Sequence, residues 1–246
     1  MNAIHCHHNT FLVLLSYVVS VLGSYTALQL AIGIPAAKSG SERWQALIGS
    51  GAAVGGGGIW AMHFIAMLAC QMNVAVTYDL PLTAASAVIG IAACTVGLAV
   101  ASSGVFSWGK LVLAGVLMGL GVAGMHYTGM AAMLMPAQTV YDPNIVVLSV
   151  VIAIVASIAA LWLAFNLRGW MQLLGAALVM GVAVCGMHYT AMAAAGFVPM
   201  ADATAVAQGL HGESLGITIF IVASVLLFGT LIVTMMRQQQ RTEIQI

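Results

Sequence analysis

Charged side chains are scarce in this sequence, which has six basic and six acidic residues among 246, or 5% of the chain. A soluble domain carries about 25% charged residues, so this chain cannot cover itself with a hydrated surface. Its formal net charge of zero gives no argument for nucleic-acid binding, which depends on basic residues. Hydrophobic residues make up 62% of the chain. We therefore expect an integral membrane protein whose solvent is the lipid bilayer, with no nucleic-acid partner.

Basic residues are also missing from the start of the chain, since residues 1–9 contain no Lys or Arg. A cleavable signal peptide needs a basic start and a shorter apolar core. The first apolar run is therefore expected to be a retained transmembrane span. The four cysteines form neither a C-x-x-C pair nor a disulfide framework.

Seven apolar runs are long enough to cross a bilayer, which takes about 20 residues. They cover residues 10–34, 46–71, 81–103, 109–135, 144–165, 170–198 and 215–236, with proline and polar residues between them. The predicted fold class is all-α: a polytopic membrane protein of seven transmembrane helices with internal repeats. We expect one domain over residues 1–236, followed by the start of a cytoplasmic linker over 237–246.

The charged residues separate onto two sides of this predicted topology. One side has the basic residues Lys38, Arg43, Lys110, Arg168, Arg237 and Arg241, and the other has only acidic residues, Asp79, Asp142, Asp202 and Glu213. Basic residues near span ends are retained in the cytoplasm. The N-terminus is therefore predicted outside and the C-terminus inside. This puts Cys6 and Cys70 on the oxidising side, where a disulfide between them is possible, although sequence cannot show that they are close.

A repeat with a period of 62 to 64 residues runs through the second, fourth and sixth spans. Each opens with a tryptophan and has a histidine 18 or 19 residues later; the pairs are Trp44 and His63, Trp108 and His126, and Trp170 and His188. At 1.5 Å per residue, each histidine lies about 27 Å from its tryptophan. Because the hydrocarbon core is about 30 Å thick, the three histidines are expected just below the outer surface.

Each histidine is part of a repeated stripe on its helix. The methionine four residues later, which is Met67, Met130 or Met192, shares the histidine's face. The glycine seven residues earlier, which is Gly56, Gly119 or Gly181, lies on nearly the same face two turns deeper. Small residues let helices approach closely, so we expect the three stripes to converge. Met62, Met125 and Met187 lie about 100° to the side and could join only with some rotation, whereas Cys185 is near the third stripe.

A polar group within a membrane span suggests function by default. Neutral imidazole and thioether favour copper, and thioether favours Cu(I) in particular. Uncharged ligands also suit a low-dielectric setting. Four alternatives stay open: histidines that only hydrogen-bond neighbouring helices, a zinc site, a haem with two of the histidines as axial ligands, and a metal or proton transporter. The last is disfavoured because transport requires polar groups along the full depth, and the cytoplasmic halves of these spans are mostly Gly, Ala, Val and Leu.

Met125-His126-Tyr127-Thr128 and Met187-His188-Tyr189-Thr190 resemble the signature of the MHYT domain, a bacterial integral-membrane sensory module. Ser24-Tyr25-Thr26-Ala27-Leu28 is similar to that family too. The resemblance implies an inner-membrane sensor that binds copper and detects oxygen, carbon monoxide or nitric oxide. By the resemblance, the ligands are Met62, His63, Met67, Met125, His126, Met130, Met187, His188 and Met192. Because the first copy has Phe64 and Ile65, the Tyr and Thr of the other copies are not expected to be primary ligands.

The family also implies partners. Its members often continue into cytoplasmic domains that make or degrade cyclic-di-GMP, and this sequence has no such domain. We therefore expect a non-enzymatic sensory unit, either a fragment of a longer protein or one acting through a separate partner. A homodimer is compatible with both.

A second group of candidate metal ligands precedes the first span, where His5, His7 and His8 surround Cys6. A short His/Cys tract can capture metal, but such a terminus can equally be disordered. These histidines, together with Cys185, are accessory candidates. His211 and Glu213 in the last outer loop are expected to be solvated.

Overall fold

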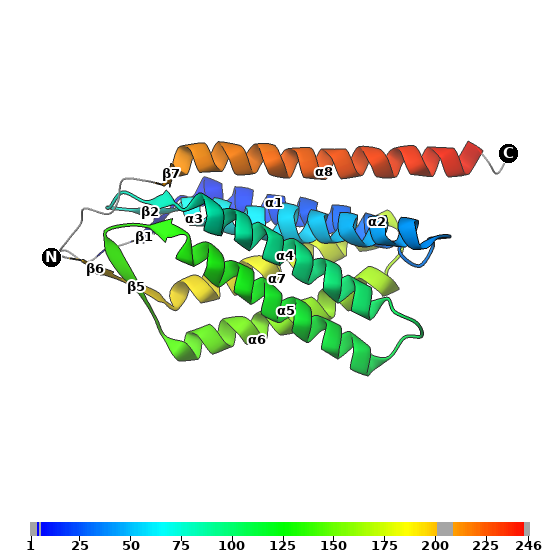
Figure 1. The fold of residues 1–246 in the computed structure, drawn as a ribbon, viewed down its shortest axis with the longest axis horizontal. Helices are drawn as coiled ribbons and strands as arrows, with labels where there is room; N and C mark the ends of the chain where they lie inside the picture. The colour runs from blue at the N-terminus through cyan, green and yellow to red at the C-terminus, as the bar shows by residue number, and fades with distance from the viewer. Residues whose placement is uncertain (1–3, 5, 201–208, 244–246) are drawn as a thin grey trace.

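The computed structural model describes residues 4, 6–200 and 209–243 and is mostly helical (Figure 1). Six helices are long and apolar enough to cross a membrane. They are α1 Thr10–Ala31, the continuous helix Gly40–Ala69, α4 Leu80–Ala101, α5 Trp108–Ala131, α6 Pro143–Asn166 and α7 Trp170–Ala193. The continuous helix consists of α2 Gly40–Gly51, the π-helix η1 Ala52–Trp60 and α3 Ala61–Ala69.

The seventh predicted span, residues 215–236, lies within α8 Gly212–Glu243. The apolar part of α8 among the described residues, Ser214–Gly229, is shorter than the six spans above. Six predicted spans are thus confirmed as apolar helices of sufficient length. The count of seven and the membrane orientation stay predictions.

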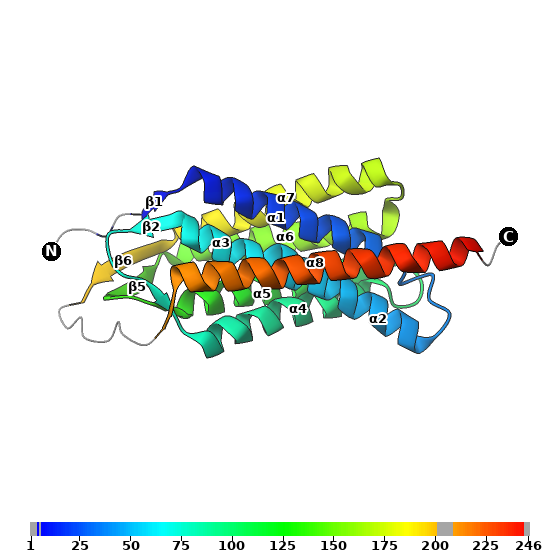
Figure 2. The ribbon, with the colours of Figure 1, turned by 90° about the horizontal axis from the view of Figure 1, so that it is seen from above.

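The six long helices form a closed ring. The helix that carries His63 contacts α1 and α4, α5 contacts α4 and α6, and α7 contacts α6 and α1. The three histidine-bearing helices therefore alternate with α1, α4 and α6. α8 packs outside the ring along α1, η1 and α3 (Figure 2).

The same backbone contact recurs at three places around this ring. Asn9, Asp79 and Asp142 are the N-caps of α1, α4 and α6, and the side chain of each accepts a hydrogen bond from the first turn of its helix. The backbone N–H groups of these residues donate to the carbonyls of Ala69, Ala132 and Ala194 at 2.8, 2.8 and 2.9 Å, respectively. Each of those alanines lies six residues after a motif histidine. The sequence repeat is therefore also a structural one.

Short strands at the end of the ring nearest the N-terminus correct the all-α prediction (Figure 1). The antiparallel pairs are β1 Cys6–His8 with β2 Cys70–Met72, β3 Thr77–Tyr78 with both β4 Met133–Leu134 and β7 Leu210–His211, and β5 Ala137–Tyr141 with β6 Ala195–Pro199. The predicted spans 109–135 and 170–198 were too long, since α5 ends at Ala131 and α7 at Ala193. Apolar residues continue past both helix ends into strands, and composition cannot separate the two in a short run.

The spacing difference between the repeats has a structural cause. His63 follows its tryptophan by 19 residues, whereas His126 and His188 follow theirs by 18. The histidine helix of the first repeat contains the π-helix η1, whose i→i+5 bonding makes wider turns. The wider turns absorb the extra residue, so that His63 reaches the same level as the other two. This helix also begins at Gly40 rather than 46, because Ser39 caps it by accepting a bond from the Glu42 N–H.

The glycine stripes pack differently from the prediction. A Cβ at Gly119 would meet the backbone of Ile154 in α6, and one at Gly181 would meet Val21 and Tyr17 in α1. In the first repeat, Gly55, the neighbour of the predicted Gly56, lies against Gly90 of α4. The stripes of Gly119 and Gly181 thus pack against the intervening helices α6 and α1 and not against one another. The histidines converge because alternating helices of the closed ring each place one histidine on its inner side.

Candidate metal centre

Three histidines meet on the inner side of the ring. His63 comes from α3, His126 from α5 and His188 from α7. The Nδ1 atom of His63 lies 3.1 Å from Nδ1 of His126 and 3.1 Å from Nδ1 of His188. One ligand nitrogen from each ring lies within 4.8 Å of the others, and all three side chains are 0–1% exposed. These three residues form the histidine triad.

Protons alone cannot satisfy the nitrogens of the histidine triad. A neutral imidazole nitrogen either carries a proton and donates or has a single lone pair and accepts. His63 Nδ1 faces two nitrogens at once, so as a donor it has one proton for two acceptors, and as an acceptor it has one lone pair for two donors. A cation among the three rings would use one lone pair from each. The donor set therefore fits a metal ion.

The far side of each ring makes no hydrogen bond to the residues that the structure describes. The Nε2 atoms of His63, His126 and His188 are buried and have no hydrogen-bond partner among the described residues. When Nδ1 binds an ion, Nε2 must carry the proton. No Asp, Glu or Cys belongs to this cluster within the described part of the chain. The site thus offers three uncharged nitrogen ligands and no counter-charge.

Comparison with known proteins places these histidines in a family. The model of the MHYT family, described as a bacterial signalling protein N-terminal repeat, matches residues 56–114 and 119–177. The chain belongs to the MHYT family. The two matched repeats contain His63 and His126, whereas His188 lies beyond them. The ring geometry adds His188 as the third equivalent position.

Three curated relatives have similar sequences. MucR of Pseudomonas aeruginosa, a bifunctional diguanylate cyclase/cyclic di-GMP phosphodiesterase, is 41% identical over 96% of this chain and 35% of its own length. The cyclic di-GMP phosphodiesterase NbdA of the same organism is 40% identical over 77% of this chain and 25% of its own. The signalling protein YkoW of Bacillus subtilis is 34% identical over 79% and 25%. The chain thus spans 25–35% of the length of these relatives. No solved structure matches it.

The aromatic residue after each MHYT histidine has a structural role that sequence reasoning missed. Phe64, Tyr127 and Tyr189 pack edge-on against the preceding imidazole, with ring centroids 4.8, 4.9 and 5.0 Å apart. The Tyr127 hydroxyl bonds Ser149 of α6 at 2.8 Å, whereas Phe64 has no hydroxyl and is fully buried. The recurring element is therefore the ring, which explains why phenylalanine replaces tyrosine in the first copy.

Gly129 is a second residue that the sequence analysis missed. A Cβ at Gly129 would overlap Nε2 of His63. The equivalent residues of the other repeats, three after each histidine, are Ala66 and Ala191. The one sequence feature that could have indicated this role is the glycine in the second copy, where the other two copies have alanine. Without a side chain, α5 can approach the His63 ring closely.

The MHYT methionines occupy several environments. Met67 and Met130 are buried, and Met192 is half-buried. Met62, Met125 and Met187 are also buried, but the Met125 side chain reaches Gly90 of α4. The structure brings the imidazoles together, whereas thioether coordination stays a prediction.

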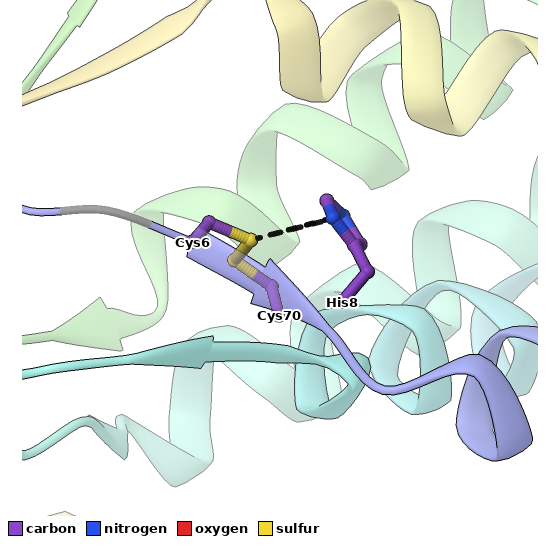
Figure 3. Close-up of a disulfide and its surroundings, with 3 residues drawn as sticks. All are labelled: Cys6, His8 and Cys70. Carbon is purple, nitrogen blue, oxygen red and sulfur yellow. Dashed lines mark hydrogen bonds between the residues drawn. A yellow bond between two sulfur atoms is a disulfide. The ribbon is translucent and has the colours of Figure 1, made fainter.

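The accessory candidates lie at the strand end. Cys6 and Cys70 form a disulfide with Cα atoms 5.3 Å apart (Figure 3), which settles the pairing that the sequence left open. His7 and His8 belong to β1, so this segment is ordered, and the His8 ring contacts the Tyr189 ring at 5.8 Å. His5 lies outside the described residues.

The remaining candidates are separate from the histidine triad. Cys185 is half-buried beside Ser16 of α1. His211 is exposed in β7, as expected of a solvated residue. Tyr78 of β3 contacts the Phe64 ring, and burial raises the pKa of its phenol. The phenol therefore stays uncharged above the triad.

Proposed function

We propose that this chain is a membrane sensory domain that holds one metal ion, with copper favoured, on His63, His126 and His188 and that it senses a diatomic gas. The observation that carries the proposal is the convergence of three buried histidines whose Nδ1 atoms hydrogen-bond only one another within the described part of the chain. Membership of a family described by its bacterial signalling repeats supports the sensory role.

Charge and ligand softness favour Cu(I) over Zn²⁺. Bringing a charge into a low-dielectric interior is costly unless it is compensated. The histidine triad supplies no negative group, so a monovalent ion needs less compensation than a divalent one. Thioether is a soft ligand that suits Cu(I), and Met67 and Met130 lie one turn from the imidazoles on the same helices.

The geometry disfavours the alternatives. A haem with two axial histidines requires space for a planar macrocycle between the rings, whereas these nitrogens are 3.1 Å apart. A transport path requires polar groups through the span. One turn below the triad, the corresponding residues are Ile59, Val122 and Val184, which would oppose passage of an ion.

A cuprous ion held by His63, His126 and His188 would supply the chemistry that binds oxygen, carbon monoxide or nitric oxide. Signalling requires that the ligand have different affinities for two helix arrangements. α8 contacts α3 and η1 and continues through Glu243, so a shift of the His63 helix would act directly on α8. From there the signal would reach a cytoplasmic unit, which the relatives' names suggest would handle cyclic di-GMP.

Two independent features support an outside N-terminus in a bacterial inner membrane. The Cys6–Cys70 disulfide lies at the strand end, and disulfides persist in oxidising compartments. At the opposite end, Lys38 lies in a connection and Arg43 and Lys110 lie in the first turns of α2 and α5, as the positive-inside rule requires. Residues 1–236 then form the sensory domain, and residues from 237 onward begin the link to the cytoplasm.

Infrared spectroscopy of the purified chain under carbon monoxide tests the sensory role. The protein, loaded with Cu(I) in lipid nanodiscs, should give one sharp C–O stretching band that shifts with ¹³CO. A variant with all three histidines changed to alanine should lack the band. Absence of the band from a wild-type sample that contains stoichiometric copper would refute gas sensing at this site.

A further inference from the structure

A small apolar cavity lies directly beneath the histidine triad. Its wall includes Ile59, Val122 and Val184, each of which precedes a motif histidine by four residues. On a helix that spacing places a residue on the histidine's face, one turn away. All three histidine-bearing helices thus contribute to the cavity at the same level, and α6 closes it.

The cavity suits a small uncharged molecule. Its volume is about 30 Å³, roughly twice the space that one water molecule requires. Of the twelve residues that line it, Ser157 is the only one with a polar side chain. Buried water needs two to four polar partners, so the cavity should be dry.

One side of the cavity faces lipid. Ala156 of α6 and Ala183 and Val184 of α7 are partly exposed, whereas Val122 and Ala153 are buried. The side chains at this boundary are small, so a small molecule dissolved in the bilayer meets little obstruction between α6 and α7. Apolar gases concentrate in hydrocarbon relative to water, and this entrance opens within the hydrocarbon layer.

We infer that this cavity is a docking site for an apolar diatomic gas. The gas enters from the lipid between α6 and α7 and binds one helical turn below the imidazoles. The inference rests on the proposed gas-sensing function for its purpose, but the cavity itself needs no metal. It assigns Val122, Ala156 and Val184 the control of gas access, separately from the three metal ligands.

Dissolved oxygen, which is paramagnetic, probes the cavity in the metal-free chain. The protein is labelled with ¹³C-methyl methionine in lipid nanodiscs, and relaxation of Met118, Met180 and Met187, which line the cavity, is measured under oxygen pressure. The reference is Met62, which is 1% exposed, compared with 2–8% for the three cavity methionines, and does not line the cavity. Oxygen should relax the three cavity methyls several-fold more than the Met62 methyl.

Cavity-filling variants complete the test. Ala156→Leu and Val184→Phe should abolish the excess relaxation, whereas Ala159→Leu and Val182→Phe, at exposed positions of the same helices, should preserve it. Using two filled variants from different helices guards against one that fails to fold. Equal relaxation at Met62 and the cavity methyls, an excess that survives filling, or relaxation by a water-soluble nickel chelate would overturn the inference. Because this test uses the metal-free chain, a negative result would not contradict metal binding by the histidine triad.

Discussion

The Nδ1 atoms of His63 and His126 lie 3.1 Å apart although 63 residues separate them in the sequence. Two lone-pair nitrogens at that distance must share either a proton or a cation. Since His188 Nδ1 lies at the same distance from His63, one proton cannot serve the whole set. Metal binding at the histidine triad therefore depends on the residues that hold these rings in position.

Gly129→Ala should weaken metal binding without removing any ligand. The new methyl group would overlap Nε2 of His63 and push that ring away from the other two. We expect metal affinity to fall by tenfold or more, or about 1.4 kcal/mol, as measured by competition with a chromogenic chelator.

Gly186→Ala is the matched control, because a Cβ there meets no other atom within 4 Å. Both changes put the same methyl group into a histidine-bearing helix. Equal affinity in the two variants would mean that the position of the His63 ring is unimportant for binding.

The aromatic rings beside the imidazoles should matter more than their hydroxyls. Tyr127→Phe removes the bond to Ser149 and should lower the free energy of unfolding by about 0.6 kcal/mol, with metal content unchanged. Tyr189→Phe should leave metal content unchanged, because it is the Tyr189 ring that packs against His188, whereas Tyr189→Ala should lower metal content. Metal loss in either phenylalanine variant would assign the hydroxyl a direct role at the site.

The repeat made the convergence of the histidines predictable. His63, His126 and His188 occupy equivalent positions of three apolar runs, and equivalent positions of parallel helices reach the same depth. The helix ends were harder to predict, because residues 133–134 and 195–198 are as apolar as the helices before them and yet pair as strands. Composition indicates that a residue avoids water, but strand pairing depends on which segments the ring brings together.

The packing around the site could not be predicted from one helix at a time. The faces of Gly119 and Gly181 were predicted correctly as close-approach surfaces, but their partners are α6 and α1. Similarly, the steric role of Gly129 depends on a ring contributed by another helix. Such relationships follow from the order of helices around the ring, which the hydropathy pattern does not contain.

Shortening η1 by one residue should leave His63 in the histidine triad. Deleting Gly57 would restore the spacing of 18 residues found in the other copies. If η1 absorbs the extra residue, its loss turns the π-helical segment into ordinary α-helix and keeps His63 at the level of the other two histidines. Metal content should match that of the wild type, and circular dichroism should keep its helical signal. Loss of metal from this variant would mean that the π-helix does not absorb the extra residue.

The Cys6–Cys70 disulfide should stabilise the strand end. It closes a separation of 64 residues, and a native disulfide typically contributes about 2–4 kcal/mol. Cys6→Ser should therefore lower thermal stability, and reductant should have the same effect on the wild type but none on the variant. Cys185→Ser, which removes a free thiol, is the control. Equal stability of Cys6→Ser and wild type would exclude a structural role.

The metal content of the purified chain is the decisive measurement for the histidine triad. Wild type and the triple variant His63→Ala/His126→Ala/His188→Ala are expressed with copper, purified without chelators and analysed for metal per chain, with His211→Ala as the exposed control. We expect one ion per chain in the wild type and in the control, and none in the triple variant. Equal metal content in all three proteins would contradict it.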